Sequence, residues 1–292
     1  MLFRVQSLAL MLCQVVLGAA NAHAQGLKFD SAGVPIHYEV LGSGTPVVLI
    51  HGVAINGRGN WSMGDIIDRL AKTNQVIVMD VRGHGRSGKP HDTDDYGLKM
   101  VEDVVRLLDH LKIEKAHVVG YSMGGLITMK LATENPDRML SACVCAAGWL
   151  RPDQEEAPEF IAAVAESLEA GKGLLPLLER LHPGDDPATK AQIFATNTFL
   201  KSANDPKALA AVFRSFPNLA ITKEQLVNCQ LPVQFIVGTN DPAPTSLAQL
   251  KEVAPSNFKI VEIKGADHMS TIAAPLFYKS LSSFLQANTA GN

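Results

Sequence analysis

Residues 116–125 of the chain read AHVVGYSMGG. The first four of these residues are mostly apolar and indicate a short buried β-strand, and residues 125–132 have the pattern of a helix. Between them, residues 120–124 match Gly-x-Ser-x-Gly, in which a serine lies in a sharp turn from a strand to a helix. The flanking glycines permit this turn because a Cβ atom would clash with the neighbouring backbone. The stretch therefore predicts a strand–turn–helix unit that lifts the Ser122 hydroxyl clear of the sheet.

Strand-like and helix-like segments alternate on both sides of this unit. Several strand-like segments are apolar throughout, which is typical of parallel strands covered on both faces. The helix-like residues 98–111 carry apolar side chains at helical spacing and acidic side chains on the other side. The alternation predicts an α/β fold, with a mostly parallel central sheet and helices on both of its faces. The expected strands are residues 36–40, 47–50, 75–80, 116–119, 140–146, 233–237 and 258–263.

The alternation stops between residues 150 and 228, which contain helix-like patterns and no convincing strand. Pro158, Pro187 and Pro206 each stand where a helix can begin. A helical block between two strands predicts a cap over the carboxyl end of the sheet, where ligands bind in such folds. We therefore expect a core of residues 25–149 and 229–292, with a helical cap insertion at residues 150–228.

A catalytic triad follows from the residues after the later strands. A serine hydroxyl becomes a strong nucleophile when a histidine takes its proton and an acid orients that histidine. In this architecture the acid and then the histidine follow the serine along the chain, each after a later strand. His268 follows the last expected strand, whereas His182 falls in the helical block. Asp241 follows the strand before it, and Asp153, which also follows a strand, is the alternative acid. The predicted triad is Ser122, Asp241 and His268.

Attack on a carbonyl group places negative charge on its oxygen, which backbone N–H groups must stabilise. The residue after the nucleophile supplies one such group, here Met123. The loop after the strand at residues 47–50 supplies the second, and we expect it from Val53, since Gly52 lets the loop pass close to the site. His51 is interpreted as a residue that packs this loop, and Asp267 as one whose side chain points away from the base.

These residues together resemble the α/β-hydrolase superfamily over about residues 36–284. Residues 80–87 (DVRGHGRS) are similar to the superfamily's Asp-x-Arg-Gly-x-Gly-x-Ser loop, and residues 135–138 to its Pro-x-Arg turn. The core is similar to small carboxylesterases, serine perhydrolases of the haloperoxidase type and enol-lactonases. The resemblance implies transfer of an acyl group to water, and it leaves the acyl group open because the cap varies within the superfamily.

The predicted function is cleavage of a carboxylic ester or lactone of a small, largely apolar substrate through an acyl-enzyme. The same triad also serves perhydrolysis and carbon–carbon bond hydrolysis, and a small-molecule receptor of hydrolase-like structure is a non-enzymatic alternative. No cofactor is expected: residues 83–88 spell Gly-x-Gly-x-x-Gly after a strand, but a loop rather than a helix follows them. No metal is expected either, because no cysteine or histidine cluster has the spacing of a metal site.

The charge of the chain also limits its partners. It has 26 Lys and Arg against 29 Asp and Glu, a net charge of −3, and no basic run. Without a basic patch we expect no binding to nucleic acid. The partner expected from the predicted function is a small-molecule ester or lactone.

Residues 1–24 have the organisation of a cleavable signal peptide. A basic residue, Arg4, precedes a mostly apolar stretch at residues 8–17, and residues 22–24 (AHA) supply a cleavage pattern. The stretch is about half of the roughly 20 residues that a membrane-spanning helix needs, so we expect no stable membrane anchor. Cleavage after Ala24 predicts a periplasmic or secreted protein.

Three cysteines remain after such a cleavage. Cys143 and Cys145 stand two residues apart in one expected strand, a geometry unsuited to a bridge between them. An oxidising compartment favours disulfides, so pairing of Cys229 with Cys143 or Cys145 stays open. The favoured interpretation is that all three are small buried apolar residues.

Overall fold

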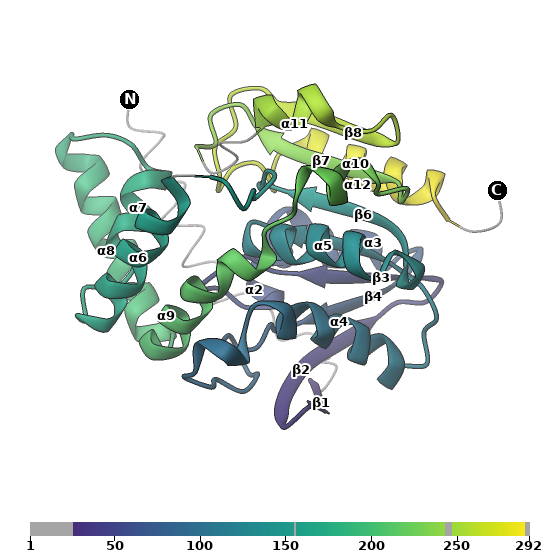
Figure 1. Ribbon diagram of the computed structural model, residues 1–292, viewed down its shortest axis with the longest axis horizontal. Coiled ribbons are helices and arrows are strands. Elements are labelled where there is room, and N and C mark those ends of the chain that lie inside the picture. The colour runs from purple at the N-terminus through teal and green to yellow at the C-terminus, as the bar shows by residue number, and fades with distance from the viewer. Residues whose placement is uncertain (1–25, 155, 243–246, 290–292) are drawn as a thin grey trace.

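The computed structural model describes residues 26–154, 156–242 and 247–289 (Figure 1). Its centre is one sheet of eight strands in the order β1-β2-β4-β3-β5-β6-β7-β8. All pairs from β4 to β8 in this order are parallel, whereas β1–β2 and β2–β4 are antiparallel. The predicted mostly parallel sheet is therefore confirmed. The strands are β1 (Leu27–Ser31), β2 (Val34–Leu41), β3 (Thr45–Ile50), β4 (Asn74–Met79), β5 (Ala116–Tyr121), β6 (Met139–Cys145), β7 (Val233–Gly238) and β8 (Phe258–Ile263).

The edge strand β1 is absent from the set expected from the sequence. It joins β2 through Ala32 and Gly33, whose φ angles of 53° and 86° are those of a two-residue hairpin turn. Such turns are recognised in sequences by Asn-Gly or Asp-Gly, and alanine seldom adopts a positive φ. The sequence at residues 32–33 therefore does not indicate this hairpin.

Helices cover both faces of the sheet, as predicted. Val104 and Ile127 pack on one face, whereas Ile67 and Phe277 pack on the opposite face. These clusters bury the β-branched side chains that point alternately to either side of the strands. The helices are α2 (Gly57–Ser62), α3 (Ile66–Leu70), α4 (Leu98–His110), α5 (Met123–Glu134), α6 (Glu156–Glu169), α7 (Leu175–Leu181), α8 (Pro187–Ala203), α9 (Pro206–Ser215), α10 (Lys223–Val227), α11 (Leu247–Val253) and α12 (Pro275–Ala287).

Between β6 and β7 the described residues form helices joined by loops, and they contain no strand. This segment contains α6 to α10, and α6 to α9 gather to the left of the sheet in Figure 1. Val164, Leu168, Leu178 and Phe213 form a buried cluster within these helices, and Ala54 from the loop after β3 joins it. The helical insertion thus contacts the loop that is expected to stabilise the oxyanion. The division of the chain into a core and a cap as separate domains stays a prediction.

Two hydrogen bonds join the entrance of the insertion to the segment before α10. The Trp149 Nε1–H group donates to the Ile221 carbonyl oxygen at 2.7 Å, and the Ile221 amide donates to the Leu150 carbonyl oxygen at 2.9 Å. These contacts join the segment that leaves β6 to the segment before α10, so the start and the end of the insertion are held together.

The three remaining cysteines are buried and unbridged in this structure. Cys143 and Cys145 point to the same face of β6, with their Sγ atoms 3.7 Å apart. Cys229 lies in the apolar cluster on the opposite face, where its Sγ is 3.7 Å from the Ala132 carbonyl oxygen. The strand cysteines and Cys229 are therefore separated by the sheet.

The predicted signal peptide, residues 1–24, lies outside the described residues. None of the helices in the described ranges has the length and apolar content needed to cross a bilayer.

Candidate active site

Ser122 lies in the turn between β5 and α5 with φ 53° and ψ −115°, a strained conformation for a residue with a side chain. A Cβ atom on Gly120 would lie 2.0 Å from the Gly124 carbonyl oxygen, and one on Gly124 would lie 2.2 Å from the Ile50 carbonyl oxygen. The sequence-based explanation of these two glycines is thereby confirmed. The Ser122 amide donates to the Cys145 carbonyl oxygen at 2.8 Å, which fixes the turn to β6.

The structure brings Ser122, His268 and Asp241 together. The His268 Nε2 atom lies 3.1 Å from the Ser122 Oγ, and the His268 Nδ1 atom lies 2.8 Å from the Asp241 Oδ2. His268 is in the turn after β8, and Asp241 follows β7. The side chains of His268 and Asp241 are 7% and 0% exposed, so water competes little for the hydrogen bond between them. This arrangement can take a proton from the serine hydroxyl.

The other acids named from the sequence lie elsewhere. The Asp153 side chain is 81% exposed and pairs with Arg151. The Asp267 Oδ1 accepts hydrogen bonds from the Met269 and Ser270 amides, so this carboxylate caps its own turn. As expected, Asp267 does not orient the base, although it precedes His268 in the chain.

Val53 and Met123 both line a cavity that Ser122 also lines. Met123 is the first residue of α5, where backbone amides have no partner within the helix. In the described part of the chain, neither the Val53 nor the Met123 amide donates a hydrogen bond. A Cβ atom on Gly52 would be 3.4 Å from the Ser122 Cβ, so the loop does pass close to the nucleophile. Both amides are thus available to a substrate oxygen.

His51 packs the loop after β3, as interpreted from the sequence. Its Nδ1–H group donates to the Gly52 carbonyl oxygen at 2.6 Å, and its Nε2 accepts from the Val81 amide at 2.9 Å. Burial lowers the pKa of His51, so the ring is neutral and keeps this tautomer. The ring therefore joins the loops that follow β3 and β4.

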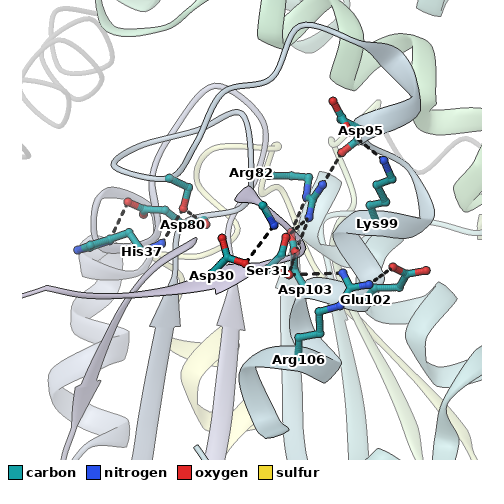
Figure 2. A network of polar contacts seen from close by, with 12 residues as sticks. Asp30, Ser31, His37, Asp80, Arg82, Asp95, Lys99, Glu102, Asp103 and Arg106 are labelled. Carbon is teal, nitrogen blue, oxygen red and sulfur yellow. Dashed lines mark hydrogen bonds and ion pairs between the residues drawn. The ribbon is translucent and has the colours of Figure 1, made fainter. Parts of the chain in front are cut away.

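A network of buried polar side chains stabilises the loops that follow β3 and β4 (Figure 2). The Asp80 carboxylate accepts from the Gly57 amide at 2.8 Å and lies 3.0 Å from the His37 Nδ1. Arg82 binds Asp103 through two hydrogen bonds, Nε to Oδ2 at 2.7 Å and Nη2 to Oδ1 at 2.6 Å. The segment at residues 80–87 therefore holds the start of α2, directly after the loop that carries Val53.

Two apolar cavities meet at Ser122. The first has a volume of about 160 Å³ and is lined by Val53 and Met123 and by apolar residues of the insertion such as Leu177 and Phe213. The second has a volume of about 120 Å³ and is lined by His268 and by Leu178 of α7. His268 lines the second cavity and not the first. The nucleophile thus stands between two compartments that differ in their access to the base.

Three further residues near the site were not expected from the sequence. Tyr121 donates from its hydroxyl to the His268 carbonyl oxygen at 2.6 Å. His182 ends α7 and lines the second cavity with His268, and burial lowers its pKa. Arg180, also on α7, lines the first cavity. The Gly-x-Ser-x-Gly pattern leaves the residue before the serine open, and α7 comes near the site only through tertiary packing, so no local sequence signal marks these three residues.

The described residues contain no group of three or more His, Cys, Asp or Glu side chains that could hold a metal ion.

Comparison with known proteins identifies relatives over part of the chain. A family model described as the alpha/beta hydrolase fold matches residues 45–272. A putative carbamate hydrolase of Azorhizobium caulinodans is 39% identical over 122 residues, which cover 40% of this chain and 43% of that protein. The 2-hydroxymuconate semialdehyde hydrolase of Pseudomonas sp. strain CF600 is 34% identical over 121 residues, 41% of this chain and 42% of that protein. The chain thus matches less than half the length of these curated relatives.

The similarity to solved structures covers more of the chain than the similarity to these relatives. The enol-lactonase from Burkholderia xenovorans LB400 superimposes with a TM-score of 0.72 and 23% identity, covering 89% of this chain and 100% of that one. A thermophilic esterase from Thermogutta terrifontis gives a TM-score of 0.72 and 24% identity, covering 90% and 99%. At such identities the likeness concerns the fold.

Proposed function

The chain belongs to the α/β-hydrolase fold family, and we propose that it cleaves a small carboxylic ester or lactone through Ser122, His268 and Asp241. The observation that carries this proposal is the line of contacts from the Ser122 Oγ to the His268 Nε2 at 3.1 Å and from the His268 Nδ1 to the Asp241 Oδ2 at 2.8 Å. In this line the imidazole can accept the hydroxyl proton while the buried carboxylate stabilises the imidazolium that forms.

In the first step, the Ser122 Oγ attacks the carbonyl carbon as its proton moves to the His268 Nε2. The carbonyl oxygen becomes negatively charged and accepts hydrogen bonds from the Val53 and Met123 amides. The tetrahedral intermediate then breaks its bond to the leaving oxygen, which takes the proton from His268. The acyl group stays on Ser122 as an ester.

In the second step, a water molecule replaces the leaving group. His268 takes one proton from this water, and the oxygen attacks the acyl carbon. The bond to the Ser122 Oγ then breaks, the oxygen of Ser122 recovers the proton from His268, and the carboxylic acid leaves. This sequence needs no group beyond the side chains and amides already described.

The two cavities support an assignment of the two halves of the substrate. The leaving oxygen must receive its proton from His268, so the leaving group occupies the 120 Å³ cavity that His268 lines. The acyl group then occupies the 160 Å³ cavity beside Met123. Taken together, the two volumes lie just below the roughly 300–1,000 Å³ typical of pockets for drug-sized ligands, which supports a small substrate.

Carbon–carbon bond hydrolysis by the same residues is a second candidate. It is favoured by the 34% identity to 2-hydroxymuconate semialdehyde hydrolase, although that alignment covers 42% of the relative. Parallel rates on p-nitrophenyl esters, on lactones and on dienoic diketones distinguish the two reactions. Perhydrolysis is recognised in the same series by peracid formation from an ester and hydrogen peroxide.

The test of the proposed function is the Ser122→Ala variant, measured on p-nitrophenyl esters from acetate to palmitate and on a few lactones. We expect the variant to lose turnover while its circular dichroism stays that of the wild type. Ser202→Ala, which removes an exposed hydroxyl on α8, is the matched control and keeps full activity. Turnover retained by Ser122→Ala would reject the nucleophile. Slow single turnover with tight product retention in the wild type would instead favour a receptor.

A further inference from the structure

Among the described residues that line the acyl cavity, Arg180 carries the one charged side chain. It lies on α7, one residue before Leu181, which lines the same cavity. The remaining lining is mostly apolar, including Leu126, Leu177 and Phe213. A single guanidinium in an apolar compartment beside the nucleophile is a candidate for recognition of a charged substrate group.

Within the described part of the chain, no carboxylate lies within 4.0 Å of the Arg180 guanidinium. The guanidinium lies over the ring of Phe160, with the Arg180 Cζ 4.6 Å from the ring centroid. Arg151 and Arg214, the other arginines of the insertion, pair with Asp153 and Glu169. Arg180 therefore differs from these two arginines in having no carboxylate partner among the described residues.

Among the described residues, no carboxylate balances the charge of Arg180. Arg180 is partly buried, so its guanidinium has lost part of its hydration. The face of Phe160 compensates for a share of that loss and also holds the guanidinium plane in place. The planar guanidinium can donate two parallel hydrogen bonds, which match the two oxygens of a carboxylate. One arginine also balances the single charge of a carboxylate.

We propose that Arg180 binds a carboxylate on the acyl part of the substrate, so that the preferred substrates are monoesters or lactones derived from dicarboxylic acids. This inference rests on the proposed function, because that function assigns the acyl group to the cavity that Arg180 lines. The apolar lining accommodates the methylene chain between the two carboxyl groups, and Arg180 binds the free one. Arg180 is thus a specificity residue, which contacts substrate and takes no part in the proton transfers.

The experiment compares two esters of matched shape. One is mono-p-nitrophenyl adipate, which carries a free carboxylate, and the other is p-nitrophenyl 6-methylheptanoate, in which an isopropyl group replaces that carboxylate. Rates are corrected for uncatalysed hydrolysis, and kcat and KM are determined for the wild type, Arg180→Met and Arg180→Lys. Arg214→Met removes the same charge from an arginine that is paired with Glu169 outside the cavity, and it is the matched control.

We expect Arg180→Met to lower the ratio of kcat/KM for the adipate ester to kcat/KM for the neutral ester by about 10- to 100-fold, mainly through KM. Arg180→Lys should give an intermediate ratio, because lysine keeps the charge and loses the paired geometry. Arg214→Met should leave the ratio unchanged. An unchanged ratio in Arg180→Met, or an equal loss on both esters, would overturn the proposal and leave Arg180 a structural role.

A failure of the proposed function is distinguishable from a failure of this inference. If the wild type cleaves neither ester, titration calorimetry with adipate still tests the carboxylate site, using Ser122→Ala and the double variant Ser122→Ala/Arg180→Met. Binding that requires Arg180 would support the site without hydrolysis. Absent binding, or binding that is equal in the two proteins, would reject it.

Discussion

The Tyr121 hydroxyl donates a hydrogen bond of 2.6 Å to the carbonyl oxygen of His268. Tyr121 is the last residue of β5 and directly precedes Ser122, so one short segment carries the candidate nucleophile and fixes the backbone of the candidate base. The two rings also pack edge to face, with centroids 5.9 Å apart. Burial raises the pKa of Tyr121 well above its ordinary value, so the phenol stays protonated and remains a donor.

Replacement of Tyr121 by phenylalanine should lower kcat by about 10- to 100-fold with little change in KM, because a small displacement of His268 weakens proton transfer. The free energy of unfolding should fall by about 1–3 kcal/mol, since the buried His268 carbonyl loses its donor. The measurements are ester hydrolysis and urea unfolding. A positioning role predicts that the pH profile of kcat keeps its shape and loses only amplitude.

Tyr278→Phe is the control for this substitution. The Tyr278 hydroxyl donates to the Arg69 carbonyl oxygen at 3.3 Å on the surface, so its removal should leave both kcat and stability nearly unchanged. Equal effects of the two substitutions on kcat would show that Tyr121 does not position His268.

The buried pair of Arg82 and Asp103 should be costly to break. Their side chains are 1% and 0% exposed and joined by two hydrogen bonds, as Figure 2 shows. Asp103→Asn leaves a buried guanidinium without its charge partner, so unfolding free energy should fall by about 3–5 kcal/mol. Glu102→Gln breaks an exposed pair with Arg106 on the same helix and should cost less than about 0.5 kcal/mol.

Urea unfolding of both variants measures this difference. Activity per folded molecule should be retained in Asp103→Asn, because the pair contacts neither cavity. A loss of less than about 1 kcal/mol would mean that the pair does not hold the loop after β4.

His84 should make the protein less stable in mild acid. It is fully buried beside His51, and burial lowers its pKa from 6.5 to about 3. Between these two values the unfolded chain binds a proton at His84 that the folded chain does not, so the unfolding free energy falls as the pH falls below 6.5. One such group contributes a slope of about 1.4 kcal/mol per pH unit.

His84→Met removes this titration, and the slope between pH 6.5 and 4.5 should decrease by about 1.4 kcal/mol per pH unit. Urea unfolding at several pH values measures it, and the slope rather than the absolute stability carries the result. Above pH 7.5 the two stability curves should run parallel. Slopes that agree between variant and wild type in mild acid would show that His84 is protonated in the folded protein as well.

The fold and the grouping of Ser122, Asp241 and His268 were predictable because short stretches of sequence indicate them. The turn that carries the serine is indicated by five consecutive residues, Gly-x-Ser-x-Gly. The carboxyl ends of parallel strands lie at the same edge of a sheet, whatever the length of the connecting loops. Asp241 and His268 follow β7 and β8, which are neighbours in the sheet, so they meet by topology alone. Asp153 also follows a strand, but the chain there turns into the helical insertion and its side chain is exposed.

The residues around the triad were less predictable because their contacts join distant parts of the chain. The hydrogen bond from Tyr121 to His268 spans 147 residues. Arg180 and His182 reach the cavities only because α7 packs near the loop after β3, and helical spacing does not tell which face of a helix points inward. The edge strand β1 depends on a turn at Ala32 and Gly33 that lacks the usual residues.

The choice between Asp241 and Asp153 yields the most direct test of the proposed triad. Asp241→Asn keeps the size of the side chain but offers His268 an amide, which leaves the imidazole in the wrong tautomer and without charge stabilisation. We expect kcat to fall by about 10³- to 10⁴-fold while circular dichroism stays unchanged. Asp153→Asn removes the same charge from a side chain that is 81% exposed, and kcat should stay within about twofold of the wild type. Ester hydrolysis by the two purified variants decides the assignment, because a large loss in Asp153→Asn, or none in Asp241→Asn, would mean that another acid orients His268.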